Sequence, residues 1–253
     1  TNFRLDSEAG FLALYPSTSR RYLDGTEIDY PLQQMDVSYG YAADTDGDAD
    51  AYGYFLDPTP GEPNPFSADW FGRLPPVDVS VPRGLYDAPV RVSLATELPG
   101  AEIRFTTDGS TPDETNGAIF DEPLLITEST VLRAVALQPG YLPGPITTNS
   151  YLFVDDVRTQ SSPPAGFPET WGTHRIDFAG HAAGNPVEAD YAMDPAIVDD
   201  PAYGPQLEEA LGSLPTLSLV FDPPDFDIYA DPQARGPASE RPVSVEFFDP
   251  LGD

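Results

Sequence analysis

The clearest alternation of apolar and polar residues lies between residues 78 and 155. Apolar residues there recur at every second position in short segments, and turn-forming residues separate these segments at short intervals. This pattern is typical of the strands of a small antiparallel β-sandwich. We expect six or seven strands in one domain of residues 78–155, in the segments VDVSVP, PVRVSLATE, AEIRFTTDGSTP, PLLIT, TVLRAVALQPGYLPGP and TNSYLFVDD.

The first 64 residues carry a second set of strand-like segments. They are FRLD, GFLALYP, TEIDYPL and YGYFLD, with a loop-like stretch from Asp36 to Ala51 before the last of them. The tail PTPGEPNPF follows, and its prolines cannot continue a central strand because they lack the backbone N–H. We therefore place a partial domain at residues 1–64 and a linker at residues 65–77.

Two further segments follow the central domain. Residues 156–200 lack a sustained period of two or of 3.6 residues, which predicts an extended linker that lies over its neighbours and is held by Trp171. In residues 201–253, PAYGPQLEEALGSLP predicts a short helix that begins near Pro205 and stops at Gly212. The segments LSLVF and VSVEFF after it are strand candidates on either side of a loop.

Composition excludes several classes of function. The chain has 253 residues with 42 acidic and 12 basic side chains, so its net charge of −30 argues against nucleic acid or anionic lipid as partners. All basic residues are arginine, which excludes chemistry that needs a lysine. Cysteine is absent, so disulfides, thiolate metal sites and a cysteine nucleophile are excluded too. No apolar run approaches the roughly 20 residues of a membrane span.

Two segments of the first half resemble known families. FLALY, SYGYAADTDGDAD and DPTPGEPN resemble the second half of a bacterial lamin-tail-type domain, which implies an immunoglobulin-like sandwich whose first strands precede this chain. IRFTTDGSTPDE, TVLRAVAL and GYLPGP resemble the fibronectin-III-like module at the C-terminal side of chitobiase and β-hexosaminidase enzymes, which implies a sandwich without catalytic residues. The residues that carry the first resemblance are Ser38, Gly40, Thr59, Pro60, Gly61 and Asn64.

The C-terminal segment has a resemblance of its own. A helix that leads into PTLSLV, an Ile-Tyr turn and then ERPVSVEFFD resembles the entry of the atypical kinase-like domain of the spore-coat CotH family. The resemblance implies that residues 201–253 are only the start of a larger α+β domain. The active site of such a kinase would lie beyond residue 253.

The sharpest candidate site is the segment DTDGDAD. Its carboxylates alternate along a glycine-containing loop, so several oxygens can converge on one hard cation such as calcium. Ala49 and Phe55 stand where an EF-hand needs glycine and glutamate, so the loop is not an EF-hand. A solvated acidic loop is the alternative. The four candidate ligands are Asp44, Asp46, Asp48 and Asp50.

Other polar clusters have simpler interpretations. Turn chemistry explains Asp108, Asp113 and Glu114, and we interpret His174 and His181 as solvated or locally bonded rather than as zinc ligands. A hydrolase is disfavoured because no G-x-S-x-G elbow is present. Helix caps and turns explain four aspartates near the C-terminus, with a second cation or a phosphate-bound metal as the alternative; they are Asp222, Asp225, Asp227 and Asp231.

Exposed aromatic side chains are a remaining candidate for ligand binding. Four of them lie near the boundary between the first domain and the linker; they are Tyr52, Tyr54, Trp70 and Phe71. Their rings could stack on sugar rings or fill a hydrophobic core or a domain seam, and the core is the favoured interpretation.

Taken together, the sequence predicts a mainly β protein. We expect tandem immunoglobulin- or fibronectin-III-like sandwiches, an extended linker, one short helix and the first strands of an incomplete α+β domain. The predicted function is a non-catalytic structural or adhesive module array of a secreted or cell-surface bacterial protein, with calcium as the one candidate cofactor. Its expected partners are protein subunits or domains that bind by edge strands or surface contact. The alternatives are the targeting arm of a CotH-like kinase and a glycan-binding accessory module.

Overall fold

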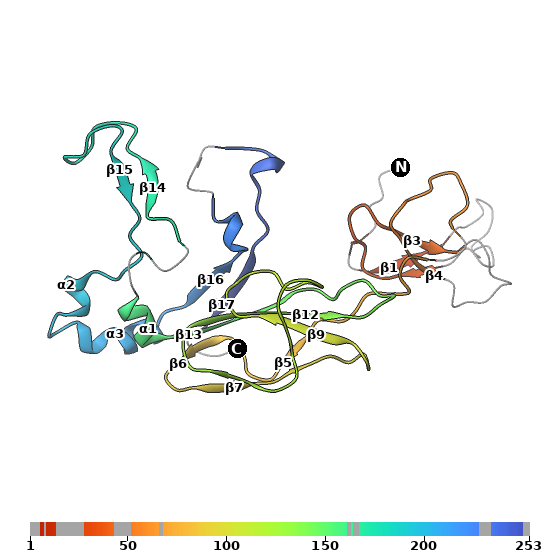
Figure 1. Ribbon diagram of the computed structural model, residues 1–253, viewed down its shortest axis with the longest axis horizontal. Coiled ribbons are helices and arrows are strands. Elements are labelled where there is room, and N and C mark those ends of the chain that lie inside the picture. The colour runs from red at the N-terminus through yellow and green to blue at the C-terminus, as the bar shows by residue number, and fades with distance from the viewer. Residues whose placement is uncertain are drawn as a thin grey trace. The chain divides into compact units, whose positions relative to one another are not determined.

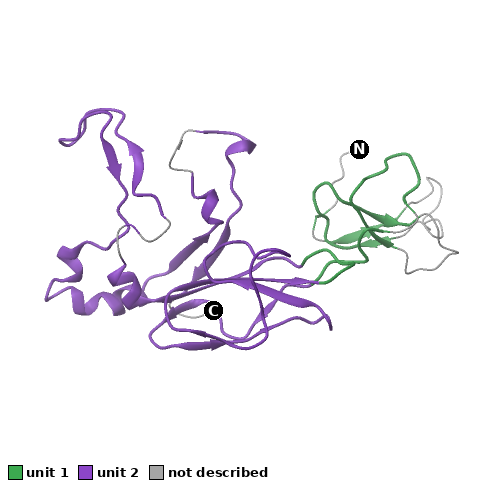
Figure 2. Cartoon of the chain, viewed as in Figure 1, with its two compact units in different colours: residues 1–74, 138–143 green, residues 75–137, 144–253 purple. Residues whose placement is uncertain are grey.

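A computed structural model describes residues 6–7, 9–13, 28–42, 52–65, 68–160, 163, 167–227 and 234–249. The chain divides into two compact units (Figure 2), of which the first comprises residues 1–74 with 138–143 and the second residues 75–137 with 144–253. Each unit builds its own sheets, and the described part is mainly β, as the sequence predicts.

The first unit contains two antiparallel strand pairs. β1 pairs with β2 and β3 pairs with β4, and the strands span Gly10–Leu12, Ile28–Tyr30, Ser38–Tyr41 and Tyr52–Phe55. β3 lies where the sequence predicted a loop, so that prediction is wrong for these four residues. The reason is cross-strand aromatic pairing, since Tyr39 lies opposite Tyr54 with ring centroids 5.0 Å apart, and Tyr41 lies opposite Tyr52 at 5.1 Å.

Residues 68–74 close this unit through backbone hydrogen bonds. The Tyr54 N–H donates to the Trp70 carbonyl at 2.9 Å, and Gly53 must lack a side chain because a Cβ there would meet that same carbonyl. Residues 138–143 return to the same segment, since the Phe71 N–H donates to the Gly140 carbonyl at 2.9 Å. Part of the stretch predicted as a linker is therefore paired structure.

The sandwich-like domain of the second unit contains nine short strands. Five of them form one sheet in the order β10-β9-β12-β13-β6, and the others form the pairs β7–β11 and β5–β8. The strands β9, β12, β13 and β6 of the large sheet are labelled in Figure 1. All the pairings are antiparallel except that of β13 with β6. The strands β5 to β13 span Asp78–Val79, Gly84–Tyr86, Val90–Val92, Leu94–Ala95, Glu102–Thr106, Ala118–Ile119, Leu124–Ile126, Thr130–Leu137 and Thr147–Phe153.

The register of β12 and β13 separates the two faces of the large sheet. Leu132 lies opposite Asn149 and Ala134 opposite Thr147, and this face is inward, because the side chains of Asn149 and Thr147 bond the carbonyls of Val81 and Val77. The core is built from apolar side chains with at most a few per cent exposure, among them Val92, Leu94, Ile126, Leu132, Ala134 and Ala136. The opposite face of the sheet carries the polar residues that define the candidate site.

The rest of the second unit consists of helices and two hairpins. The helices are α1 Val154–Thr159, α2 Pro195–Val198 and α3 Leu207–Gly212, with the 3₁₀ turns η1 Gly204–Gln206, η2 Pro223–Asp225 and η3 Pro237–Ser239. The hairpin β14–β15 spans Thr170–Thr173 and Pro186–Glu188, and β16–β17 spans Thr216–Val220 and Ser244–Phe248. The predicted helix and the two predicted C-terminal strands are thus confirmed.

The hairpin β14–β15 lies within the stretch that the sequence predicted as an extended linker. Its register shifts between Thr170 and Thr173, so the strand does not keep a period of two. Gly172 has a φ of +89°, a conformation that suits glycine. The irregular strand explains why the sequence pattern did not reveal the hairpin. Among the residues that the structure describes, no helix is both long and apolar enough to cross a membrane.

Candidate functional site

The outward face of the five-stranded sheet is polar, yet it is buried. Thr106 lies opposite Arg133 in the strand register, and Arg133 lies opposite Thr148, so the three side chains share one face with Ser150. Each is less than a tenth exposed. Thr148 and Ser150 are covered by the hairpin β16–β17, which lies against β13 (Figure 1), whereas Thr106 and Arg133 bond the turn at Gly109 and Ser110. We call this covered surface the docking face.

Glu246 of β17 is the central side chain of the docking face. It is 2% exposed, and its carboxylate accepts from Ser150 on β13, at 3.0 Å from the backbone N–H and 2.5 Å from the hydroxyl. The Ser218 hydroxyl of β16 lies 3.0 Å from that of Ser150, and the Arg83 guanidinium lies 3.9 Å from the carboxylate. A buried carboxylate is tolerated only with such partners, because removing it from water is costly.

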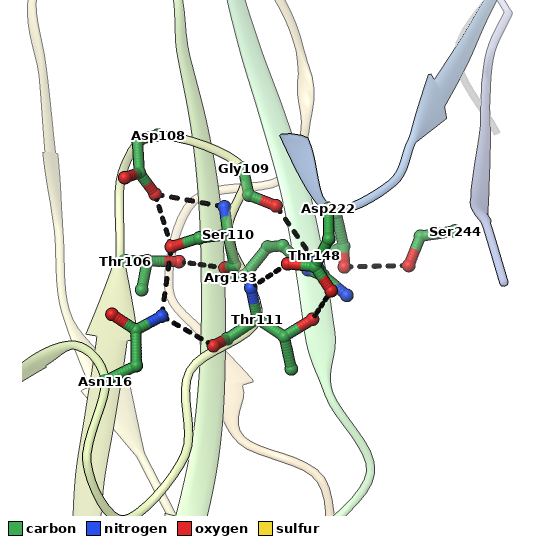
Figure 3. Close-up of polar contacts among 10 residues, drawn as sticks. All are labelled: Thr106, Asp108, Gly109, Ser110, Thr111, Asn116, Arg133, Thr148, Asp222 and Ser244. Atoms are coloured by element: carbon green, nitrogen blue, oxygen red, sulfur yellow. Dashed lines mark hydrogen bonds and ion pairs between the residues drawn. The ribbon is translucent and has the colours of Figure 1, made fainter. Parts of the chain in front are cut away.

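Asp222, just after β16, makes the second polar connection (Figure 3). Its carboxylate accepts from the Thr111 N–H and from the Thr111 hydroxyl, both at 2.5 Å, and lies 3.5 Å from Arg133. Arg133 also donates to the Gly109 carbonyl at 2.9 Å. Asp222 is the N-cap residue of η2, as the helix-cap and turn interpretation predicted, and its backbone carbonyl accepts from the Asp225 N–H at 2.8 Å. Its side chain makes no cap hydrogen bond, because Thr111 uses both carboxylate oxygens.

The neighbouring aspartates have local partners. Asp225 and Asp227 pair with Arg241 at 3.6 and 2.8 Å, and the hydrogen bond from Arg241 lowers the pKa of Asp227. Asp231 lies outside the described residues. Asp225 and Asp227 therefore form surface ion pairs with Arg241.

The segment Thr106 to Glu114 is a turn region, as the sequence predicts. Asp108 accepts from the hydroxyl and the N–H of Ser110, at 2.6 and 3.0 Å, and these bonds lower its pKa. Asp113 accepts from the N–H and hydroxyl of Thr115, which lowers its pKa in the same way, and Glu114 beside it is exposed. The turn presents Gly109 and Thr111 to the docking face (Figure 3).

An aromatic cluster attaches the other hairpin. The Trp171 ring lies 5.1 Å from Tyr191 and 5.8 Å from Phe226, and Phe167 contacts the same two rings at 5.7 and 5.6 Å. Phe221 stacks on Phe226 at 5.3 Å. Trp171 thus holds its segment against η2, which is the role that the sequence suggested.

The two histidines meet in the loop of the hairpin β14–β15. The rings of His174 and His181 stack with centroids 4.8 Å apart, beside a surface pocket of about 490 Å³ that Asn185 and Glu188 also line. Across the described ranges, no three or more His, Cys, Asp or Glu side chains are grouped to hold a metal. The stacked rings are a local contact of the kind that the sequence suggested for these two histidines.

The remaining candidates have mixed outcomes. Asp44, Asp46, Asp48 and Asp50 lie outside the described residues, so the calcium site stays a prediction. Tyr54 is buried, as a core residue should be, whereas Phe71 is 67% exposed and Tyr52 and Trp70 are intermediate. Sequence reasoning did not identify Glu246, Ser150 or Arg133. The one signal was a charged residue at the centre of the apolar strand VSVEFF.

Comparison with known proteins places one family in this region. No curated protein and no solved structure matches the chain. Residues 81–148 match the family model of the chitobiase/beta-hexosaminidase C-terminal domain, which is 68 of the 253 residues and runs from before β6 into β13. The lamin-tail and CotH resemblances stay predictions. Residues 81–148 therefore form a domain of the chitobiase/beta-hexosaminidase C-terminal type, and the hairpin β16–β17 lies on the docking face of its sheet.

Proposed function

We propose that this chain is a non-catalytic structural module array of a secreted or cell-surface bacterial protein. In it, the domain at residues 81–148 is a rigid base that holds the C-terminal hairpin in one orientation. The observation that carries the proposal is Glu246, a buried carboxylate bonded to two donors of Ser150. A slip of one residue would bring Val245 or Phe247 against Ser150 and expose the carboxylate, so the polar contacts specify the register.

Hydrogen exchange on the full chain tests this rigidity. If base and hairpin form one cooperative unit, slow amides of β16 and β17 exchange with the same opening free energy as those of β12 and β13. Exchange of the hairpin through its own, easier opening would contradict a rigid base. Turnover of chito-oligosaccharides, or phosphotransfer from ATP by this chain, would contradict its non-catalytic role.

A glycan-binding accessory module is the second candidate function. Two observations support it: the matching family is named for a domain of sugar-cleaving enzymes, and the hairpin β14–β15 carries the partly exposed Trp171 as well as a surface pocket lined by His174 and His181. A glycan array with the full chain and with Trp171→Ala tests it. Signals that Trp171→Ala removes would support glycan binding, and the absence of any signal would eliminate it.

The targeting arm of a CotH-like kinase is a third proposal, supported by the resemblance of residues 199–253 alone. Its test is phosphotransfer by a longer parent polypeptide, because the active site would lie beyond residue 253.

Calcium binding by Asp44, Asp46, Asp48 and Asp50 completes the proposal. A ligand that binds only the native state stabilises it by about 2.7 kcal/mol at a hundredfold excess over Kd. Calcium should therefore raise the melting temperature of the first unit, and Asp46→Asn with Asp48→Asn should remove the difference. Identical melting curves in calcium and in chelator would reduce the loop to a solvated acidic turn.

A further inference from the structure

The hairpin β16–β17 exposes an apolar face on the side away from the docking face. In the strand register Leu217 lies opposite Phe247, and Leu219 opposite Val245. These four side chains are 55–60% exposed, and Leu214 and Val243 extend the surface at 60% and 47%. We call these six residues the apolar face.

The hairpin places most of its apolar side chains on its open side. Its covered side carries Ser218, Ser244 and Glu246 with the buried Val220 and Phe248, whereas its open side carries only leucine, valine and phenylalanine. An antiparallel sheet with one solvated face normally turns its apolar residues inward and its polar residues outward. The polar contacts of Glu246 oppose that arrangement, and they leave the four apolar side chains of the open side without a place in the covered layer. A contiguous exposed apolar patch marks an interaction surface.

We propose that the apolar face binds one amphipathic α-helix of a partner protein, whose leucine-rich stripe is flanked by arginine or lysine. The dimensions favour a helix. Two strands about 4.8 Å apart and five residues long give a surface roughly 10 Å wide and 17 Å long. One helix of about 10 Å diameter covers that width over three turns, whereas a second sheet would overhang it on both sides.

Charge determines the character of the helix. The described residues 207–227 and 234–249 contain eight carboxylates and two arginines. Glu246 and Asp222 are bonded on the docking face, and Asp225 and Asp227 are paired with Arg241. Exposed carboxylates still outnumber the remaining arginine; they include Glu208, Glu209 and Glu240. An apolar stripe with basic flanks complements this surface. A second copy of the chain does not, because each copy carries a net charge of −30 and the two would repel one another.

A designed peptide tests the proposal on the full chain. The probe is a labelled helix of about 18 residues with leucine at i, i+3, i+4 and i+7 and arginine or glutamine elsewhere. Its control has the same composition with the leucines scattered around the helix. We expect saturable binding by fluorescence anisotropy, about tenfold weaker for the scattered control, and a further weakening with salt.

Variants locate the binding. Leu217→Thr with Phe247→Thr keeps strand propensity and should weaken binding about tenfold, whereas Leu125→Thr on β11, equally exposed, should leave it unchanged. If the double variant unfolds, amide shift changes in the wild type replace it, and they should cluster on β16 and β17.

Three outcomes would overturn the proposal: no saturable binding, equal binding of both peptides, or shift changes elsewhere. Sedimentation that shows a dimer dispersed by the double variant would assign the face to a second copy instead. None of these outcomes changes the hydrogen-exchange test of the rigid base.

Discussion

The two hairpins of the second unit are attached by different chemistry. β14–β15 is held by aromatic rings, through Trp171 against Tyr191 and Phe226. β16–β17 is held by buried hydrogen bonds, through Glu246 against Ser150. Ring contacts tolerate displacement because centroid separations of 4.5–7 Å are all favourable. Hydrogen bonds to a buried carboxylate do not, because they weaken steeply with angle and leave a costly charge when broken. We therefore expect a locally mobile first hairpin and a rigid second one.

The largest expected effect comes from Glu246→Ala. The change leaves the Ser150 N–H buried without an acceptor and opens a cavity, so the free energy of unfolding should fall by about 3 kcal/mol. Urea denaturation of the full chain measures it. Glu240→Ala, an exposed carboxylate of the same segment, should change it by less than about 0.5 kcal/mol. Equal effects of the two variants would remove the distinction between the hairpins.

Trp171→Ala tests the aromatic attachment. Two ring pairs worth about 0.5–1.5 kcal/mol each are lost, so the hairpin β14–β15 should open more easily by about 1–3 kcal/mol. Hydrogen exchange should show a lower opening free energy at residues 170–173 and 186–188, whereas the opening free energy of β12 and β13 should not change. Phe178→Ala, 68% exposed, is the control with no expected effect. A parallel loss in β13 would show that the two hairpins open together.

Asp222→Asn separates hydrogen bonding from charge on the docking face. Asparagine keeps one oxygen for Thr111 but removes the attraction to Arg133, so a loss of about 1–2 kcal/mol is expected by urea denaturation. Asp225→Asn is the matched control, because Asp225 makes a surface pair with Arg241 worth about 0–1 kcal/mol. If Asp225→Asn lowers the free energy of unfolding as much as Asp222→Asn does, the contacts of Asp222 on the docking face contribute no specific stabilisation.

The contrast between the hairpins also explains what the sequence could predict. LSLVF and VSVEFF were predictable as strands because local alternation and turn residues specify them. The orientation of the two strands was not predictable from the sequence. Glu246 bonds Ser150, which lies 96 residues earlier, whereas alternation alone would place Glu246 in solvent. β14–β15 was missed because its register shift breaks the period of two. β3 was missed because Gly40 and its tyrosines resemble a loop until the pairing with β4 is known.

The smallest predicted effect concerns the turn that serves the rigid hairpin. Ser110 donates two hydrogen bonds to Asp108 and lowers its pKa below the usual 3.8. A carboxyl whose pKa is lower in the folded state stabilises that state above its unfolded pKa, and the contribution is lost as the pH falls through the folded pKa. Asp108→Asn should therefore cost a few tenths of a kcal/mol at pH 7, because Asp108 is largely solvated, and progressively less as the pH falls below 3.8.

Urea denaturation of the wild type and of Asp108→Asn, at pH 7 and at a pH below 3.8, measures the cost of the substitution under each condition. Carboxyl NMR titration should place the Asp108 midpoint below 3.8. Asp87→Asn, at an exposed position of the same domain, is the control and should change the free energy of unfolding by less than about 0.5 kcal/mol. The turn presents the Gly109 carbonyl to Arg133 and the Thr111 donors to Asp222. Any loss of stability should therefore appear, by hydrogen exchange, as easier opening of β16–β17 and not of β14–β15. An Asp108 midpoint at or above 3.8, or a loss of equal size in both hairpins, would show that this turn does not support the docking face.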